Sequence, residues 1–139
     1  MSNGSNQSSN QSWGITVLRV VVGIVFLAHG AQKVFTFGHQ GVTGMLGSMG
    51  VPLPGVMSVV LMAVEFLGGA ALVLGLFTRW VAALNGFDMV VAILLVHLKN
   101  GFIKPGGFEH PLTLLAACVA LAMLGPGAAS VDGALAKRE

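Results

Sequence analysis

The chain has 139 residues, of which 55% are hydrophobic and only 9% are charged. Soluble domains carry ~25% charged residues, so this composition excludes an ordinary soluble domain and indicates an integral membrane protein of about four spans. The net charge of +2 is too small for the clustered basic surface of a nucleic-acid-binding protein, and a single cysteine, Cys118, excludes an intrachain disulfide or a CxxC redox motif.

Residues 1–13 are rich in Ser, Asn and Gln and contain neither a basic region nor a cleavage site. We therefore expect a flexible polar tail and not a secretory signal, followed by a retained first span at residues 14–35. At ~100° per residue, one stripe of this span collects its small and polar side chains. Small residues let membrane helices approach closely, so the stripe is expected to face the other helices. The stripe comprises Arg19, Gly23, His29, Gly30 and Lys33.

A glycine-rich connector at residues 37–53 follows the first span. Its repeating apolar positions predict a short helix lying at the membrane interface, because long structureless connectors are uncommon in compact domains. The second span is predicted at residues 54–77, and residues 78–80 form a very short turn, which makes the second and third spans antiparallel neighbours. By helical phase, one face of the second span comprises Ser58, Glu65, Gly69 and Leu72.

The third span is predicted at residues 80–98 and buries Asn85 and Asp88. By helical phase Asp88 lies opposite His97, so the two side chains are not expected to point at one neighbour. A glycine- and proline-rich connector at residues 99–109 breaks the helix. The fourth span begins near Glu109, with a proline in its first turn, and its apolar run reaches Leu124. This run is short for a full crossing, so the helix either continues past Pro126 or ends beneath the lipid headgroups.

These elements predict an all-α fold: a four-helix transmembrane bundle at residues 14–135, with a short interfacial helix or loop between spans 1 and 2 and a charged tail at residues 136–139. An even number of spans places both termini on one side of the membrane. The basic residues on that side are Arg79, Lys137 and Arg138, and those on the other side are Lys33, Lys99 and Lys104. The basic-residue rule then favours cytoplasmic termini in the cell's inner membrane.

Glu65 lies near the middle of a span that contains no other charged residue. A carboxylate at this depth is too short to reach the headgroups, so it must be paired, hydrogen-bonded or protonated. Arg19 has two interpretations: it either extends to the headgroups or forms an ion pair with Glu65 or Asp88. We predict a structural buried polar network, which comprises Arg19, Glu65, Asn85 and Asp88.

A second set of polar residues lies near one membrane boundary and includes His29, Lys33, His97 and Glu109. His110 belongs to the same side. Histidine exchanges protons near neutral pH, so an imidazole beside a lysine and a carboxylate can hydrogen-bond quinone carbonyls and transfer protons. The alternative is that lysine and histidine are ordinary residents of headgroup regions. The candidate quinone and proton site comprises His29, Lys33, Glu65, His97 and Glu109.

Other cofactors have less support from the sequence. A haem held by His29 and His97 would need both side chains at matching depth and facing each other, and no further signal supports it. A metal held by His97, Glu109 and His110 matches no established spacing, so no metal site is expected.

Several short motifs in order along the chain resemble the DoxX family of small bacterial four-helix membrane proteins, and the resemblance covers residues 14–135. They are the HGxxK of the first span (His29, Gly30, Lys33), Glu65 with Gly68 and Gly69, then Leu76, Thr78 and Arg79, the stretch from His97 through Gly101, Phe102, Gly107 and Glu109, and a GPGxxSxD ending at Asp132. One departure is that Ala128 and Ala129 replace the basic and aromatic residues common in the family.

The resemblance implies a fold more firmly than a reaction. Some family members resemble the small membrane subunit of thiosulfate:quinone oxidoreductase, and others are associated with redox or oxidative-stress complexes. The preferred hypothesis is therefore a membrane subunit of a redox system that binds a quinone and receives electrons or reactive sulfur from a partner protein. The competing hypothesis is a non-enzymatic scaffold or accessory subunit of a larger membrane complex. A transporter is disfavoured because four spans show no internal repeat.

Overall fold

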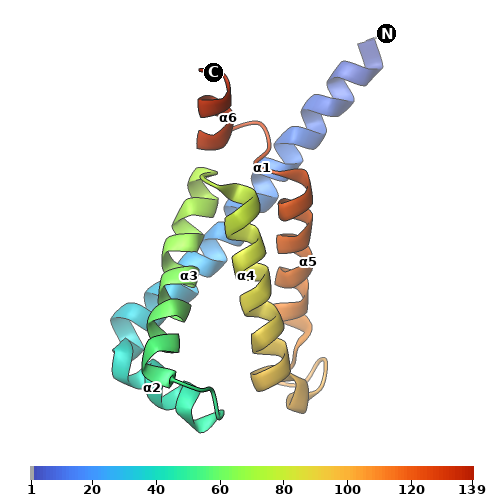
Figure 1. Cartoon of the computed structure of the whole chain (residues 1–139). Coiled ribbons are helices and arrows are strands. Elements are labelled where there is room, and N and C mark those ends of the chain that lie inside the picture. The colour runs from blue at the N-terminus through green and yellow to red at the C-terminus, as the bar shows by residue number, and fades with distance from the viewer. Residues whose placement is uncertain (1) are drawn as a thin grey trace.

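The computed structural model describes residues 2–139, with side chains from Gly4 onward, and this part of the chain contains helices and no strands. Helices α1 (Ser2–Ala31), α3 (Pro54–Leu74), α4 (Thr78–Ala92) and α5 (Glu109–Leu124) form the bundle, and the two chain ends lie at the same end of it (Figure 1). Three helical stretches are long and apolar enough to cross a membrane, Gly4–Ser48, Pro54–Leu74 and Thr78–Asn100, and a shorter apolar helix accompanies them. The predicted all-α bundle is therefore confirmed.

The first helix starts much earlier than the sequence indicated. Helix α1 begins at Ser2, and its first turns extend beyond the bundle (Figure 1). The residues predicted to form a flexible polar tail are therefore helical from Ser2 onward. The physical reason is cooperativity: once the apolar span has formed a helix, each added residue gains a hydrogen bond without a new nucleation cost. Between Gly4 and Gln11 every residue is exposed, so these polar side chains need no buried partners.

At the end opposite the termini, the regular α-helical winding is interrupted twice. A π-helix, η1 (Gln32–Phe37), follows α1, and a second, η2 (Ile93–His97), follows α4 and leads into a short 3₁₀ turn, η3 (Leu98–Asn100). Such π-helical segments are rare and frequently accompany functional sites. They also change the helical phase, so angular positions calculated at 100° per residue no longer hold beyond Ile93.

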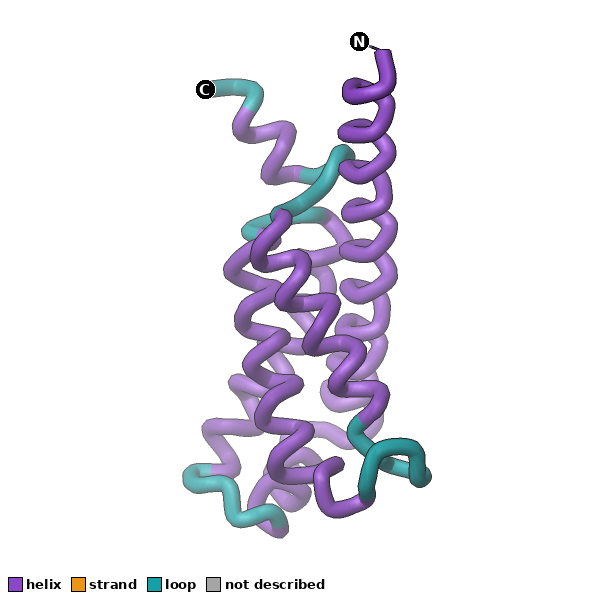
Figure 2. The backbone as a smooth tube through the Cα atoms, turned by 90° about the vertical axis from the view of Figure 1, so that its right-hand side faces the viewer, coloured by secondary structure: helices purple, strands orange, loops and turns teal. Residues whose placement is uncertain are grey.

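The predicted interfacial helix is present as α2 (Gly38–Ser48), which begins where Gly38 adopts a left-handed φ of 68° and redirects the chain. It packs on α3 through buried Val42 and through a 2.9 Å hydrogen bond between the hydroxyls of Thr43 and Ser58. Figure 2 shows that the loops gather at the two ends of the bundle, where short connectors join neighbouring helices.

Helices α1 and α3 pack backbone against backbone through glycine. A Cβ added at Gly69 would lie 2.7 Å from Leu27 Cα, and one added at Gly30 would lie 2.5 Å from Phe66 Cα. Contact this close is possible only without side chains, and it is how helices associate when lipid offers no hydrophobic contrast. The predicted buried face of α3 is confirmed, since its buried residues are Ser58, Glu65, Gly69 and Leu72.

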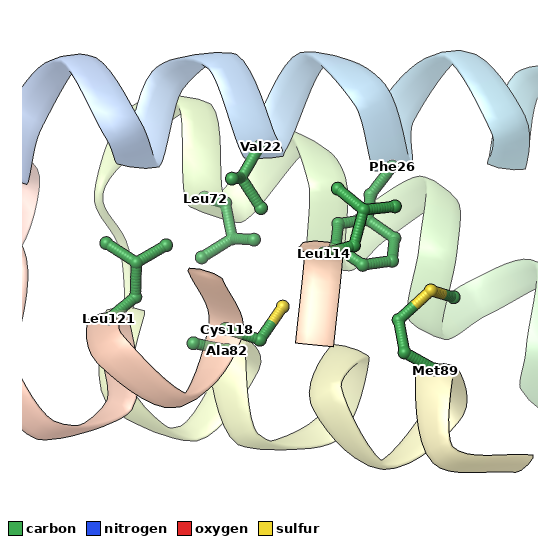
Figure 3. Close-up of a cluster of buried hydrophobic side chains, with 8 residues drawn as sticks. All are labelled: Val22, Phe26, Leu72, Ala82, Met89, Leu114, Cys118 and Leu121. Carbon is green, nitrogen blue, oxygen red and sulfur yellow. The ribbon is translucent and has the colours of Figure 1, made fainter. Parts of the chain in front are cut away.

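An apolar core fills the space between α1, α3, α4 and α5 (Figure 3). Cys118 of α5 is fully buried within it as a free thiol, consistent with a small hydrophobic residue. Many large apolar side chains point outward instead, which suits a lipid environment. The core residues are Val22, Phe26, Leu72, Ala82, Met89, Leu114, Cys118 and Leu121.

The turn between α3 and α4 lies earlier than predicted. Helix α3 ends at Leu74, the following Gly75 has a left-handed φ of 72°, and Phe77 has a φ of 48°, so that Thr78 already opens α4. Residues 78–80 are thus the first turn of a helix and not a turn between helices. The reason is that a distant carboxylate, that of Asp132, accepts hydrogen bonds from the amides of Phe77 and Thr78 and fixes the helix start there.

Helix α5 begins at Glu109, as predicted, and ends at Leu124, where Gly125 has a φ of 88°. Of the two outcomes left open by the sequence, the helix therefore ends before Pro126. A further short helix, α6 (Val131–Ala136), was not predicted, and the side chain of Ser130 caps it by accepting a hydrogen bond from Gly133 N.

Candidate functional site

The buried carboxylate of Glu65 is paired. Its Oε2 lies 2.6 Å from Nζ of Lys33, which reaches it from η1, and the side chains of Lys33 and Glu65 are only 15% and 5% exposed. Buried ion pairs require close geometry to offset the cost of desolvating both charges. Of the three states that the sequence allowed for Glu65, the structure therefore contains a direct ion pair.

Helix α4 brings two further polar side chains to the same region of α3. Asp88 is partly buried, and its carboxyl group interacts with that of Glu65 and with Lys33. Asn85 is fully buried and donates to Val81 O at 3.1 Å, and a Cβ at Gly68 would meet its amide nitrogen at 2.6 Å. We name Lys33, Glu65, Asn85 and Asp88 the membrane-core cluster.

Arg19 does not join this cluster. It is 2% exposed, and its guanidinium donates to the carbonyl oxygens of Pro126, Ala129 and, at 3.5 Å, Val73. Lys33 lies 14 residues further along the chain, about 21 Å at 1.5 Å per residue. Both predicted interpretations of Arg19 were therefore wrong: it neither extends to headgroups nor pairs with Glu65 or Asp88. Its partners are backbone carbonyls, two of them supplied by a loop more than a hundred residues away and one by the end of α3, which helical phase cannot reveal.

The GPGxxSxD ending owes its pattern to contacts at the terminal end of the bundle. Arg79 donates to Ala122 O at 3.2 Å and to Met123 O at 2.7 Å, so it satisfies the last carbonyls of α5. The hydroxyl of Thr16 accepts from Ala128 N at 2.9 Å and from Ala129 N at 3.3 Å. These partners are backbone atoms, so Ala128 and Ala129 fulfil this role without the side chains common in the family. We name Thr16, Arg19, Arg79 and Asp132 the terminal clamp.

Replacing Asp132 by Asn is expected to lower the free energy of unfolding by about 1–2 kcal/mol, because a neutral side chain replaces a charged acceptor. The two carboxylate oxygens of Asp132 lie 2.7 Å from Phe77 N and 2.9 Å from Thr78 N. Thermal unfolding of the purified protein in detergent measures the change. Glu139→Gln, at the exposed chain end, is the control and should leave stability unchanged. Equal stability of the two variants would contradict the assigned role of Asp132.

A cavity of about 400 Å³ opens between α1, the η2 end of α4, the loop at residues 101–108 and the start of α5. This volume lies in the usual ~300–1,000 Å³ range of small-molecule sites. Its lining combines an apolar wall, mostly of buried side chains, with a rim of more exposed ionisable side chains. The apolar wall is formed by Val25, Phe26, Met89 and Leu114, and the rim by His29, His97, Lys104, Glu109 and His110.

The hydrogen bonds of two histidines show which ring nitrogen is already engaged by the backbone. Nδ1 of His29 lies 3.0 Å from Val25 O, and Nδ1 of His97 lies 2.7 Å from Gly106 O. A carbonyl only accepts, so each Nδ1 carries the proton, and Nε2 of the neutral ring is left as an acceptor. The ring of His29 also stacks on that of His110, with centroids 6.2 Å apart.

The structure thus places the residues of the predicted quinone and proton site in two separate locations. His29, His97 and Glu109 line the cavity, whereas Lys33 and Glu65 belong to the membrane-core cluster. His29 and Lys33 are one helical turn apart, but the first contacts α5 and the second contacts α3. The sequence placed Lys104 at the same membrane boundary as these residues, but the candidate site drawn from it did not include Lys104. Its place in the connector next to Gly106 and Gly107 was the available signal, but only the loop path brings it to the rim.

No group of three or more histidine, cysteine or acidic side chains in the described part of the chain converges as metal ligands do. His97 is directed to the backbone of its own loop, and Glu109 and His110 are exposed.

The comparisons agree with this architecture. The model of the DoxX family matches residues 14–98. The chain is 37% identical over 108 residues to the "Putative oxidoreductase CatD" of Bacillus subtilis, covering 78% of each protein. It is 32% identical over 126 residues to the inner membrane protein YqjF of Escherichia coli, covering 90% of this chain and 94% of that protein. No solved structure gave a significant match. The chain belongs to the DoxX family of membrane proteins.

Proposed function

We propose that the protein is the membrane subunit of a redox system and binds a quinone or quinol in the cavity between α1, η2 and α5. The observation that carries the proposal is the pairing of an apolar wall with a rim of three histidines, a lysine and a carboxylate in one cavity of about 400 Å³. An aromatic ring with polar oxygens at its edge matches such a surface, because its body is apolar and its substituents need hydrogen-bond partners. The name of the Bacillus relative, an oxidoreductase, supports the same class of function.

The histidine tautomers favour the hydroxyl-bearing form of the ligand. Both His29 and His97 donate through Nδ1 to backbone carbonyls, so their Nε2 atoms can accept protons. Lys104 on the rim supplies a donor for an oxygen that accepts. A bound quinone or quinol would supply the combined transfer of electrons and protons. The residues of this chain would hold the ring, orient its oxygens and take up protons at Nε2.

Electron exchange then requires a partner protein, because the sequence contains no motif for an electron-transfer cofactor. We further propose that the termini are cytoplasmic and that the protein lies in the inner membrane. Arg79, Lys137 and Arg138 flank the terminal side, whereas Lys33 is paired inside the bundle and leaves Lys99 and Lys104 on the other side. The cavity would then open away from the cytoplasm.

Quinone binding is tested with protein purified in nanodiscs and a short-chain quinol. His29→Ala and His97→Ala are each expected to weaken binding about tenfold, the effect of losing one hydrogen bond worth about 1.4 kcal/mol. Isothermal titration calorimetry measures the affinity, and quinone extracted from the purified proteins gives an independent readout.

His39→Ala is the matched control, because His39 is also exposed and contacts a backbone carbonyl, Gly55 O at 2.8 Å, but lies outside the cavity. It should bind as the unmodified protein does. If the unmodified protein binds no quinol, or if the cavity variants retain full affinity and quinone content, the proposal fails and the accessory-subunit hypothesis remains.

A further inference from the structure

The membrane-core cluster brings one cation and two carboxyl groups together. Lys33 pairs with Glu65 at 2.6 Å, and Asp88 interacts with both. If all three were ionised, the cluster would carry a net negative charge between helices whose outer faces are apolar. An uncompensated charge in such surroundings is costly, whereas one bound proton makes the cluster neutral.

The hydrogen bonds of the cluster also indicate one bound proton. Within the described part of the chain, Asp88 Oδ2 and Asn85 Oδ1 are buried acceptors without a donor. Buried polar atoms are nearly always satisfied, so two such atoms one helical turn apart require an explanation. A proton on Asp88 turns one of these acceptors into a donor. Two ionised carboxylates are also acceptors only and repel each other, so the contact between Glu65 and Asp88 is favourable only when a proton is present.

We propose that Glu65 and Asp88 together bind one exchangeable proton opposite Lys33, and so form a proton-binding site inside the membrane, distinct from the cavity. The charged and titratable groups that face the pair are Lys33 from η1 and Cys118 from α5. Cys118 is fully buried among apolar side chains, where a thiol stays neutral. Lys33 is therefore the charged group that faces the pair. Proton uptake involves no other bond: the proton moves from water to a carboxylate oxygen and is released to water again.

Infrared spectroscopy of the purified protein in nanodiscs tests this directly, because a protonated carboxyl group has a C=O stretch separate from that of a carboxylate. The unmodified protein is expected to show this band at neutral pH, and the band should shift in heavy water. In Asp88→Asn and in Glu65→Gln the band should disappear, since the single remaining carboxyl group pairs with Lys33. In Lys33→Met it should grow about twofold, because both carboxyl groups then take up protons.

Glu109→Gln is the control, since this exposed carboxyl group is part of the cavity rim and should not alter the band. Absence of the band in the unmodified protein at neutral pH would overturn the proposal, even if the variants do not fold. So would a band that persists in both Asp88→Asn and Glu65→Gln, or stabilisation of the unmodified protein by sodium in place of the proton. None of these outcomes depends on quinone binding, so the proton site and the cavity can fail separately.

Discussion

Replacing Arg19 by Met is expected to lower the free energy of unfolding by about 3 kcal/mol or more, which is a large part of the stability of a small protein. The variant leaves Pro126 O and Ala129 O without their donor in a region where Arg19 itself is 2% exposed. A carbonyl that loses its donor where water cannot replace it costs roughly 1–3 kcal/mol, and here two carbonyls lose theirs together. Unfolding in mixed detergent micelles, followed by circular dichroism, measures the effect.

Two other variants separate the role of the Arg19 guanidinium from that of charge alone. Arg19→Lys keeps the charge but has one ammonium where the guanidinium donates through two nitrogens, so it should recover only part of the stability. Arg138→Met removes an exposed arginine near the chain end and should change stability by less than about 0.5 kcal/mol. If Arg19→Met were as stable as Arg138→Met, Arg19 would not hold the C-terminal loop.

Replacing Gly69 by Ala is expected to be highly disruptive for the addition of a single methyl group, lowering the free energy of unfolding by on the order of 3 kcal/mol. The new Cβ would lie 2.7 Å from Leu27 Cα and 2.9 Å from Gly23 O, and both are backbone atoms that move only if the helices separate. Since α1 leads directly into η1, which carries Lys33, this separation should also weaken the ion pair with Glu65. Thermal unfolding in detergent measures the loss of stability.

Gly44→Ala is the matched control for the Gly69 variant. Gly44 also lies within a helix, and a Cβ there would meet nothing within 4 Å. Alanine is the better helix former, so this variant should be as stable as the unmodified protein or more stable by about 0.5–1 kcal/mol. Comparable losses from both substitutions would mean that helix propensity, and not the contact between α1 and α3, decides the outcome.

The location of both sites was only partly predictable. Periodicity identified Glu65 and Asp88 as buried, because ionisable residues inside a span must face the protein. It could not separate Lys33 from His29, which are four residues apart and point to different helices. The position of His97 was beyond the reach of helical phase, since the π-helix from Ile93 to His97 alters the angle between successive residues. Two of the three partners of Arg19, Pro126 O and Ala129 O, lie in a loop, for which no periodic rule exists.

The sequence by itself determined that the protein belongs in a membrane, that four main helices form its bundle, and which face of α3 is buried. These properties follow from hydrophobicity and from the 3.6-residue period, which are local along the chain. The tertiary structure alone decided that Arg19 and Asp132 close the terminal end, that Lys33 pairs with Glu65, and that the histidines gather around a cavity. Those contacts join segments far apart in sequence, and they depend on where glycines let α1 and α3 meet and on how the loops bring the helix ends together.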